Sequence, residues 1–473
     1  GPVERQSGAF AVSFDTERYD SLGAFSATLT AAVENAGTAP EVVYYWDLDG
    51  DGIAEPENSG AGKTSVSVDF TTYGTTPVTL WATNTAAVPA AGAVWTRDFT
   101  VAPAVHYVVG NNPDAAPPYA TWATAATNIQ HAIDIAAPGA EVVLSNGTYM
   151  LNTRLDLAKR VTVRGLTGDW NDVILNGKNA GLWATVYIHY GDAVLSGVTV
   201  REGFNGSDYW AGGIQLFAGT VTNCRVTACS VNSANRYGTG IRNYGGHLVD
   251  SLIDNNYVAR GNFTGGGLYQ YDAGALTERC VITNNYATSA SGTGGIGAYV
   301  AAGVLRNSLI GRNRAGTIST LQATGVRQGG GVIENCTIVG NTWSASAASR
   351  PYATGFYHTG GYATNCLIAD NAIMDGIASN WVSTAASRIA YTCTTPLAPA
   401  LGEGCVLDNG GSYRVREGIL QLPHSSPCIG AGFNQPWMDG ASDLYGNRRI
   451  VGRRVDIGCT ECPDGAGLIL QIR

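Results

Sequence analysis

The strongest constraint on the fold is an internal repeat whose units are 27–30 residues long and begin at about residue 213. Each unit has a small residue before a short β-branched or leucine-rich stretch, and these small residues are Cys224, Ser251, Cys280, Ser308, Cys336 and Cys366. A unit of this length cannot bury an apolar face alone, so neighbouring units must stack and share a core. The chain is therefore expected to form a solenoid in which equivalent residues lie about 4.8 Å apart.

A second column of the repeat, five residues further on, is rich in asparagine: Cys229, Asn256, Asn285, Asn313, Asn341 and Asn371. An amide side chain both donates and accepts hydrogen bonds, so these asparagines are predicted to form a ladder from coil to coil. Cysteines of the first column that lie two coils apart are separated by about 9.6 Å, which is too far for a disulfide. Cys336 and Cys366 lie in adjacent coils and are within reach of each other, but buried thiols are predicted there.

Residues 104–375 are assigned to a parallel β-helix, and a short helix at 128–137 is predicted to cap its first coil. Four apolar residues of this segment share one helical face: Ile129, Ala132, Ile133 and Ala136. The Pro138-Gly139 pair ends the helix. Such a cap covers strand edges that the first coil would otherwise expose.

Residues 376–473 are predicted to contain the final coils and a disulfide-bearing closing region. Five cysteines lie there: Cys393, Cys405, Cys428, Cys459 and Cys462. They are expected to form disulfides in an oxidising, extracellular compartment. Cys459 and Cys462 also form a CxxC pair, but one such pair without a second is a weak metal signal.

Residues 6–103 have a different pattern, with short alternating strands separated by turn residues at roughly ten-residue spacing. This pattern predicts an immunoglobulin-like β-sandwich. Residues 1–5 are assigned to a linker left by expression.

The first 103 residues carry 13 acidic and 4 basic side chains, which accounts for the net charge of −9 of the whole chain. An acidic chain argues against a nucleic-acid partner.

The segment YYWDLDGDGIAE places Asp47, Asp49 and Asp51 at alternating positions around a glycine turn. Three carboxylates in this arrangement can converge on a hard cation such as Ca²⁺. A calcium loop carries a bidentate Glu at its twelfth position, where this chain has Asn58. The segment therefore fits either a structural Ca²⁺ site or a solvated acidic turn.

Three parts of the chain resemble known families. The segment around Asp47 resembles the Trp-Asp-rich signature of polycystic-kidney-disease-type domains, which implies a spacer role for residues 6–103. The segments GAEVVLSNGTYMLNTRLDLAKRVTVRG, GGGLYQYDAG and NCTIVGN resemble bacterial right-handed parallel β-helix repeat proteins of the pectate-lyase-like superfamily. The C-terminal segment SSPCIGAGFNQPWMDGASDLYGNRRIVGRRVDIGCTEC is similar to the choice-of-anchor region of such proteins.

The β-helix resemblance covers residues 106–462 and implies an all-β protein, a right-handed parallel β-helix preceded by a β-sandwich, at a bacterial surface. The superfamily includes polysaccharide lyases and hydrolases, and also adhesins. The signature motifs of its polygalacturonases and pectate lyases are absent from this sequence. No catalytic residue is therefore assigned from the resemblance.

The glycine-rich strand of each repeat indicates a possible ligand surface. If its first apolar residue points inwards, the next residue faces outwards. The first outward column then reads Gln215, Arg242, Tyr269, Gly297, Arg327 and Tyr357, and the second reads Phe217, Tyr244, Tyr271, Tyr299, Gly329 and Thr359. Aromatic faces stack on sugar rings, and Arg pairs with carboxylates or sulfates. The residues predicted to bind a polysaccharide are Asp208, Tyr209, Trp210, Tyr244, Tyr299 and Tyr357.

Two reactions fit these residues. A lyase acting on a uronate needs a cation beside the carboxylate, for which Arg242 and Arg327 are candidates. It also needs a base and an acid, for which Tyr269, Tyr271 and His358 are candidates. The same register points His358 inwards, so a buried core histidine is the alternative for that residue.

A glycoside hydrolase needs two carboxyl groups near the scissile bond. One candidate is Asp272, at the end of LYQYD, and the other is Glu202 or Asp208 in the loop REGFNGSDYW, with Asp208 and Asp272 as the nearest pair. About two coils separate them, which corresponds to roughly 10 Å.

The sequence thus predicts an extracellular or cell-surface protein that binds and cleaves an anionic polysaccharide, by β-elimination or by glycoside hydrolysis. The alternative is a non-catalytic surface adhesin or structural stalk. The chain is expected to be a monomer without a transmembrane helix, because it has no apolar run of about 18 residues. Apart from the possible structural Ca²⁺, no cofactor is expected.

Overall fold

The computed structural model describes residues 10–36, 41–84, 91–178, 184–205, 210–232, 236–260, 262–288, 291–292, 294–316, 321–344, 352–373, 376–416 and 418–462. The chain divides into two compact units. One comprises residues 1–106 and 135–141, and the other comprises residues 107–134 and 142–473. No helix among the described residues is long and apolar enough to cross a membrane.

The first unit contains two β-sheets. The three-stranded sheet consists of β1 (Ala11–Asp15), β3 (Phe25–Glu34) and β6 (Ser65–Phe70). The five-stranded sheet consists of β2 (Asp20–Leu22), β8 (Ala91–Ala102), β7 (Gly74–Asn84), β4 (Val42–Asp47) and β5 (Gly60–Ala61). The first half of β3 alternates between buried and exposed residues, as a strand with one core face must.

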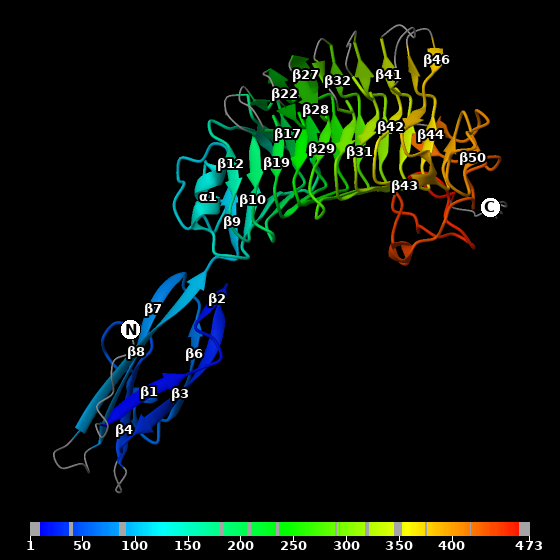
Figure 1. Ribbon diagram of the computed structural model, residues 1–473. Helices are drawn as coiled ribbons and strands as arrows, with labels where there is room; N and C mark the ends of the chain where they lie inside the picture. Colours follow the sequence, from blue (N-terminus) through cyan, green and yellow to red (C-terminus); the bar gives the residue numbers. More distant parts are fainter. Residues whose placement is uncertain are drawn as a thin grey trace, which may run out of the picture. The chain divides into compact units, whose positions relative to one another are not determined.

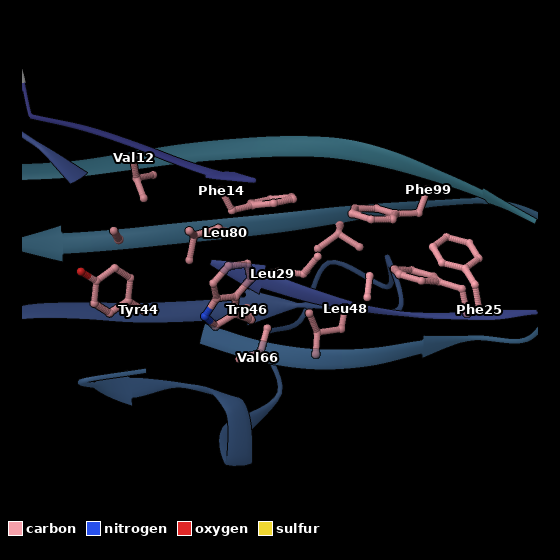
Figure 2. Packing of buried hydrophobic residues seen from close by; sticks show 14 of the residues in the cluster. Val12, Phe14, Phe25, Leu29, Tyr44, Trp46, Leu48, Val66, Leu80 and Phe99 are labelled. Atoms are coloured by element: carbon pink, nitrogen blue, oxygen red, sulfur yellow. The ribbon is translucent and has the colours of Figure 1, made fainter. Parts of the chain in front are cut away.

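The two sheets share one apolar core. Figure 2 shows Phe14 and Leu29 from the smaller sheet beside Trp46, Leu80 and Phe99 from the larger one. Trp46 is fully buried, and its indole Nε1 donates to the carbonyl oxygen of Lys63 at 3.0 Å, so its polar atom is satisfied. This arrangement is that of a β-sandwich, as predicted.

The second unit is a parallel β-helix, which confirms the predicted fold class. A typical coil consists of β24 (Ile241–Asn243), β25 (His247–Val249), β26 (Leu252–Asp254) and β27 (Tyr257–Arg260). These four strands belong to four different sheets, of 9, 11, 11 and 8 strands. Each pairs in parallel with its equivalent in the next coil, so equivalent strands lie side by side along the stack (Figure 1).

Each coil turns its two tightest corners with a single residue in the left-handed backbone region. One corner residue has a φ of +48° to +56° and is Asn223, Asp250, Arg279, Asn307, Asn335 or Asn365. The other has a φ of +53° to +64° and is Ala228, Asn255, Asn284, Arg312, Gly340 or Asp370. Asn, Asp and Gly adopt this conformation most readily, which explains why they precede the two repeat columns so often.

The predicted asparagine ladder is confirmed. In each step the side-chain Nδ2 of one asparagine donates to the Oδ1 of the next at 2.8–3.2 Å, and the ladder comprises Asn256, Asn285, Asn313, Asn341, Asn371 and Asn380. All six are buried. Because the side chains link coil to coil in one line, the ladder fixes the register of the stack.

The cysteines of the first repeat column are buried thiols, as predicted. The disulfides expected in the closing region are absent among the described residues, where Cys393, Cys405, Cys428 and Cys459 are thiols. Cys428 and Cys459 instead pack in an apolar cluster with Leu367, Leu420 and Ile457. The sequence pattern did not distinguish buried thiols of this kind from disulfide partners.

The predicted cap helix is present but shorter than expected. Helix α1 spans Ile129–Ile135, and its buried residues include Ile129, Ala132 and Ile133. Asn128 caps its start, since its Oδ1 accepts a hydrogen bond from the backbone N–H of Gln130 at 2.8 Å. The prediction of 128–137 therefore placed the helix correctly and extended its C-terminal end by two residues.

Candidate functional site

The nine-stranded sheet of the β-helix carries the predicted ligand surface. Its strands are β12 (Leu155–Leu157), β15 (Val186–Ile188), β19 (Ile214–Leu216), β24, β29 (Leu268–Gln270), β34 (Ala298–Val300), β38 (Val326–Gln328), β42 (Phe356–His358) and β47 (Trp381–Ser383). Successive residues of a strand point to opposite faces of the sheet. In strands β12 to β42 the first and third residues are buried, so the middle residue faces outwards. Strand pairing aligns these middle residues in one outer column: Asp156, Tyr187, Gln215, Arg242, Tyr269, Tyr299, Arg327 and Tyr357.

One position of the predicted columns was wrong. Tyr299, and not Gly297, pairs with Tyr269 on one side and Arg327 on the other, so it belongs to the outer column. The prediction aligned Ile296 with the first inward residue of the strand. Ile296 is buried, but it fills a separate apolar cluster with Val258 and Leu321, and the strand begins two residues later.

Arginines of the outer column pack on tyrosine rings. The Arg242 guanidinium lies 4.6 Å from the ring centroid of Tyr244, 5.0 Å from that of Tyr237 and 5.9 Å from that of Tyr269. Arg242 is only 8 % exposed, and this burial lowers its pKa from the usual value for an arginine, which lies far above neutral pH. Arg327 lies 4.5 Å from the ring centroid of Tyr299. Both arginines are thus cations held at an aromatic surface.

The aromatic rings beside these arginines form a continuous chain of contacts, named here the aromatic strip. Neighbouring ring centroids along it are 4.5–6.5 Å apart, and its members are Tyr187, Trp210, Phe217, Tyr244, Tyr271, Tyr269 and Tyr299. Phe217 is 36 % exposed and Tyr271 is 47 % exposed. Exposed rings that continue into half-buried ones occur at binding surfaces.

Tyr269 does not fit its predicted role as a base. Its side chain is 4 % exposed, and burial, together with the nearby Tyr299, raises its pKa well above the usual value for a tyrosine. A phenol with a raised pKa is a poor base at neutral pH. Tyr271 is exposed beside it, with the two ring centroids 5.8 Å apart.

His358 is a core histidine, which contradicts its predicted role in acid–base catalysis. It is fully buried inside the coil. Its Nδ1 lies 2.7 Å from Ser383 Oγ and its Nε2 lies 3.3 Å from the carbonyl oxygen of Gly361. Burial lowers the pKa of the imidazole, so the ring is held neutral and cannot reach an external ligand.

The predicted carboxylate pair is described only in part. Asp272 is exposed in the turn after β29, where its Oδ1 accepts a hydrogen bond from the backbone N–H of Gly274 at 3.0 Å. Asp208 and Tyr209 lie outside the described residues. Tyr357 is half-buried and packs edge-on against Tyr352 with a centroid distance of 5.2 Å.

Sequence analysis missed a charged group at the first coils of the same sheet. Asp156 lies in the outer column, and His189 follows Tyr187 by two residues. His189 Nε2 is 2.8 Å from Asp156 Oδ1, and Arg154 Nη2 is 3.2 Å from Asp156 Oδ2. These residues precede residue 213, where the repeat becomes recognisable. Extending the outward columns into the segments TRLDL and VYIHY would have found them.

The acidic turn of the β-sandwich brings together a slightly different set of ligands from the predicted one. Carboxylate oxygens of Asp47, Asp49 and Glu55 lie within 4.8 Å of one another. Asp51 is not part of this group, and its Oδ1 accepts the backbone N–H of Ile53 at 2.7 Å. Glu55 joins the group because the turn folds it back, and its carboxylate accepts a hydrogen bond from the backbone N–H of Leu48. Oxygen ligands of this kind fit Ca²⁺.

Comparisons with known proteins give weak similarities. No family model and no curated protein matches the chain, so the resemblances of its N-terminal and C-terminal parts stay predictions. Two solved structures are similar. The crystal structure of pectate lyase Pel9A has a TM-score of 0.46 and 14 % identity, over 76 % of this chain and 96 % of that chain. The structure of the PL6 family alginate lyase AlyGC has a TM-score of 0.22 and 15 % identity, over 62 % and 53 %. At these values neither similarity identifies a family, and the function has to be argued from the surface itself.

Proposed function

We propose that the β-helix binds a linear anionic polysaccharide along the aromatic strip. The single observation that carries this proposal is the chain of aromatic rings in contact with Arg242 on one sheet face. Sugar rings have apolar faces that stack on aromatic side chains. A guanidinium pairs with the carboxylate of a uronate or with a sulfate group. An anionic polysaccharide offers both kinds of group in every repeating unit.

The geometry of the sheet favours a polymer over a single sugar. Parallel pairing in register places the residues of the outer column at steps of about 4.8 Å. The column runs without interruption from Tyr187 to Tyr357 through seven strands. Regularly spaced positions of this kind suit a ligand with a repeating structure. Such a ligand also implies an extracellular or cell-surface location.

The alternative of a non-catalytic adhesin shares the same binding surface. The burial of Tyr269 and His358 favours it over catalysis at the predicted residues, because neither side chain can transfer a proton to an external sugar. Binding is therefore the function proposed for the strip.

Affinity electrophoresis tests the binding. Gels containing polygalacturonate, alginate or a sulfated glycan are expected to retard the protein, whereas gels containing a neutral glucan do not. Tyr271→Ala removes an exposed ring, which is worth about 1 kcal/mol in a stacking contact and weakens binding about fivefold.

The matched control is Tyr362→Ala. Tyr362 is 58 % exposed and belongs to β43 (Tyr362–Thr364) in another sheet, so its removal leaves retardation unchanged. Binding at the strip would be refuted if no anionic glycan retarded the protein, or if both variants lost retardation equally.

A further inference from the structure

The group missed by sequence analysis has the arrangement of an acid–base centre. His189 and Asp156 come from adjacent coils, since Asp156 pairs with Tyr187 in the parallel register of β12 and β15. The Asp156 carboxylate contacts the His189 imidazole through one oxygen at 2.8 Å and Arg154 through the other at 3.2 Å. All three side chains are partly exposed, so an external ligand can reach them.

The His189 imidazole is held by Asp156 at its edge and by Tyr187 on its face. The Tyr187 ring stacks on the His189 ring with a centroid distance of 4.4 Å and an interplanar angle of 6°. Arg154 in turn lies 4.5 Å from the Tyr187 centroid and 5.6 Å from that of Trp210. Tyr187 and Trp210 are members of the aromatic strip, so a polymer bound along the strip lies beside this group.

Contacts with the cap helix fix the position of Asp156. The backbone N–H of Asp156 donates to Gln130 Oε1 at 2.8 Å, and Gln130 Nε2 donates to the backbone oxygen of Asp156 at 3.2 Å. Gln130 and Arg154 also line one pocket with Asn128 and Asn152. The carboxylate is thus attached to rigid elements, as a preorganised site requires.

We propose that His189 is the catalytic base of a uronate lyase centre, in which Arg154 neutralises the substrate carboxylate and Asp156 positions the imidazole. The inference rests on the proposed binding function and narrows its ligand to a uronate-containing polysaccharide. A carboxylate that holds one imidazole nitrogen fixes the tautomer and leaves the other nitrogen to accept a proton. Among the described residues, no hydrogen bond to His189 Nδ1 is found, so this atom is the one assigned to the proton transfer.

The reaction needs no second reactant. Arg154 pairs with the uronate carboxylate and makes the adjacent C–H more acidic. His189 Nδ1 removes that proton, and the electron pair of the C–H bond forms a double bond to the next ring carbon. The glycosidic C–O bond at that carbon breaks, and the departing oxygen takes the proton back from the imidazolium. The products are a chain with a new hydroxyl end and a chain that ends in an unsaturated uronate.

Ultraviolet absorbance of the conjugated double bond measures this cleavage on polygalacturonate, alginate and a glucuronate-containing polymer. The wild-type protein is expected to cleave at least one of them. His189→Ala is expected to lower kcat about 100-fold or more and to keep its retardation in affinity gels. Asp156→Asn is expected to lower kcat with KM and melting temperature unchanged, whereas a change that merely disturbed the fold would lower the melting temperature as well.

The control variant is His247→Ala, whose imidazole is exposed in β25 of another sheet, and it keeps full activity. Equal melting temperatures of all variants establish that they are folded. Wild-type protein that binds these polymers and cleaves none overturns the lyase inference and leaves the binding proposal standing. Full activity of His189→Ala overturns it as well. Absence of both binding and cleavage refutes the proposed function together with the inference.

Discussion

Asn313 illustrates how single residues hold the β-helix together. Its Nδ2 donates to the Ile282 carbonyl oxygen and to Asn341 Oδ1, both at 3.0 Å. Its Oδ1 accepts from the backbone N–H and the Nδ2 of Asn285, again at 3.0 Å. The side chain is fully buried, so water cannot replace any of these bonds. Each ladder asparagine therefore satisfies polar groups of both neighbouring coils.

Replacing Asn313 by Ala is expected to lower the free energy of unfolding by about 4 kcal/mol, because several buried partners lose their hydrogen bonds at once. Denaturant unfolding of the whole chain measures this loss. Asn171→Ala makes the same chemical change in an exposed turn and is expected to cost less than about 0.5 kcal/mol. Equal stability of the two variants would show that the ladder does not stabilise the fold.

The acidic turn of the β-sandwich yields a second residue-scale prediction. Ca²⁺ binding by Asp47, Asp49 and Glu55 is expected to raise the melting temperature, since a ligand that binds only the folded state stabilises it. Glu55→Gln is expected to abolish this calcium-dependent shift. Glu57→Gln, which changes an exposed neighbour outside the group, is expected to keep it. Identical melting curves of the wild type in EDTA and in Ca²⁺ would exclude the site.

At the residue scale, the sequence predicted the positions of side chains in the columns correctly wherever the repeat was regular. Arg242, Tyr269 and Arg327 lie in one column because their coils are aligned without ambiguity. Tyr299 was misplaced because an apolar residue upstream imitated the start of its strand. Exposure was harder to predict than alignment, since burial of Tyr269 depends on tyrosines contributed by other coils.

Tight corners connect the short strands of each coil. At most corners the left-handed residue is Asn, Asp or Gly, but Ala228 has a φ of +53° and is exposed. This conformation costs a residue with a Cβ about 1 kcal/mol. This corner is therefore less favourable than the equivalent ones in neighbouring coils.

Ala228→Gly is expected to raise the free energy of unfolding by about 0.5 kcal/mol, because relief of the backbone strain exceeds the entropy that glycine gains in the unfolded chain. Ala273→Gly, at an exposed turn residue without a positive φ, is expected to lower it by a similar amount, about 0.5 kcal/mol. Urea unfolding of both variants gives the sign of each effect. A stability loss at Ala228 equal to that at Ala273 contradicts this account of the corners.

Elements were predicted well where periodicity determines them and less well at the ends of the stack. The cap helix was recognised from its apolar face, but its last turn was overestimated because Ala136 and Ala137 favour a helix locally. The first coils were not assigned columns, which is why the group around His189 was missed. Cysteine spacing alone did not reveal that the closing region buries its thiols.

The stacked coils of the β-helix support the outer column. From Tyr187 to Tyr299, the first and last coils of the aromatic strip, the column makes four steps of about 4.8 Å, a length of about 19 Å. Figure 1 shows the labelled strands β19, β29 and β42 of this sheet following one another along the stack. A polymer that follows this column contacts more coils as it becomes longer, so its affinity depends on its length.

Calorimetric titration with oligosaccharides of increasing length, prepared from the anionic polysaccharide that binds best, tests this central claim most directly. Affinity is expected to rise with each added sugar until the oligomer spans about 19 Å, to fall at high salt, and to lose its length dependence in the double variant Phe217→Ala, Tyr271→Ala. An affinity that is the same for the shortest and the longest oligomers, or a length dependence that survives in the double variant, would contradict binding along the strip.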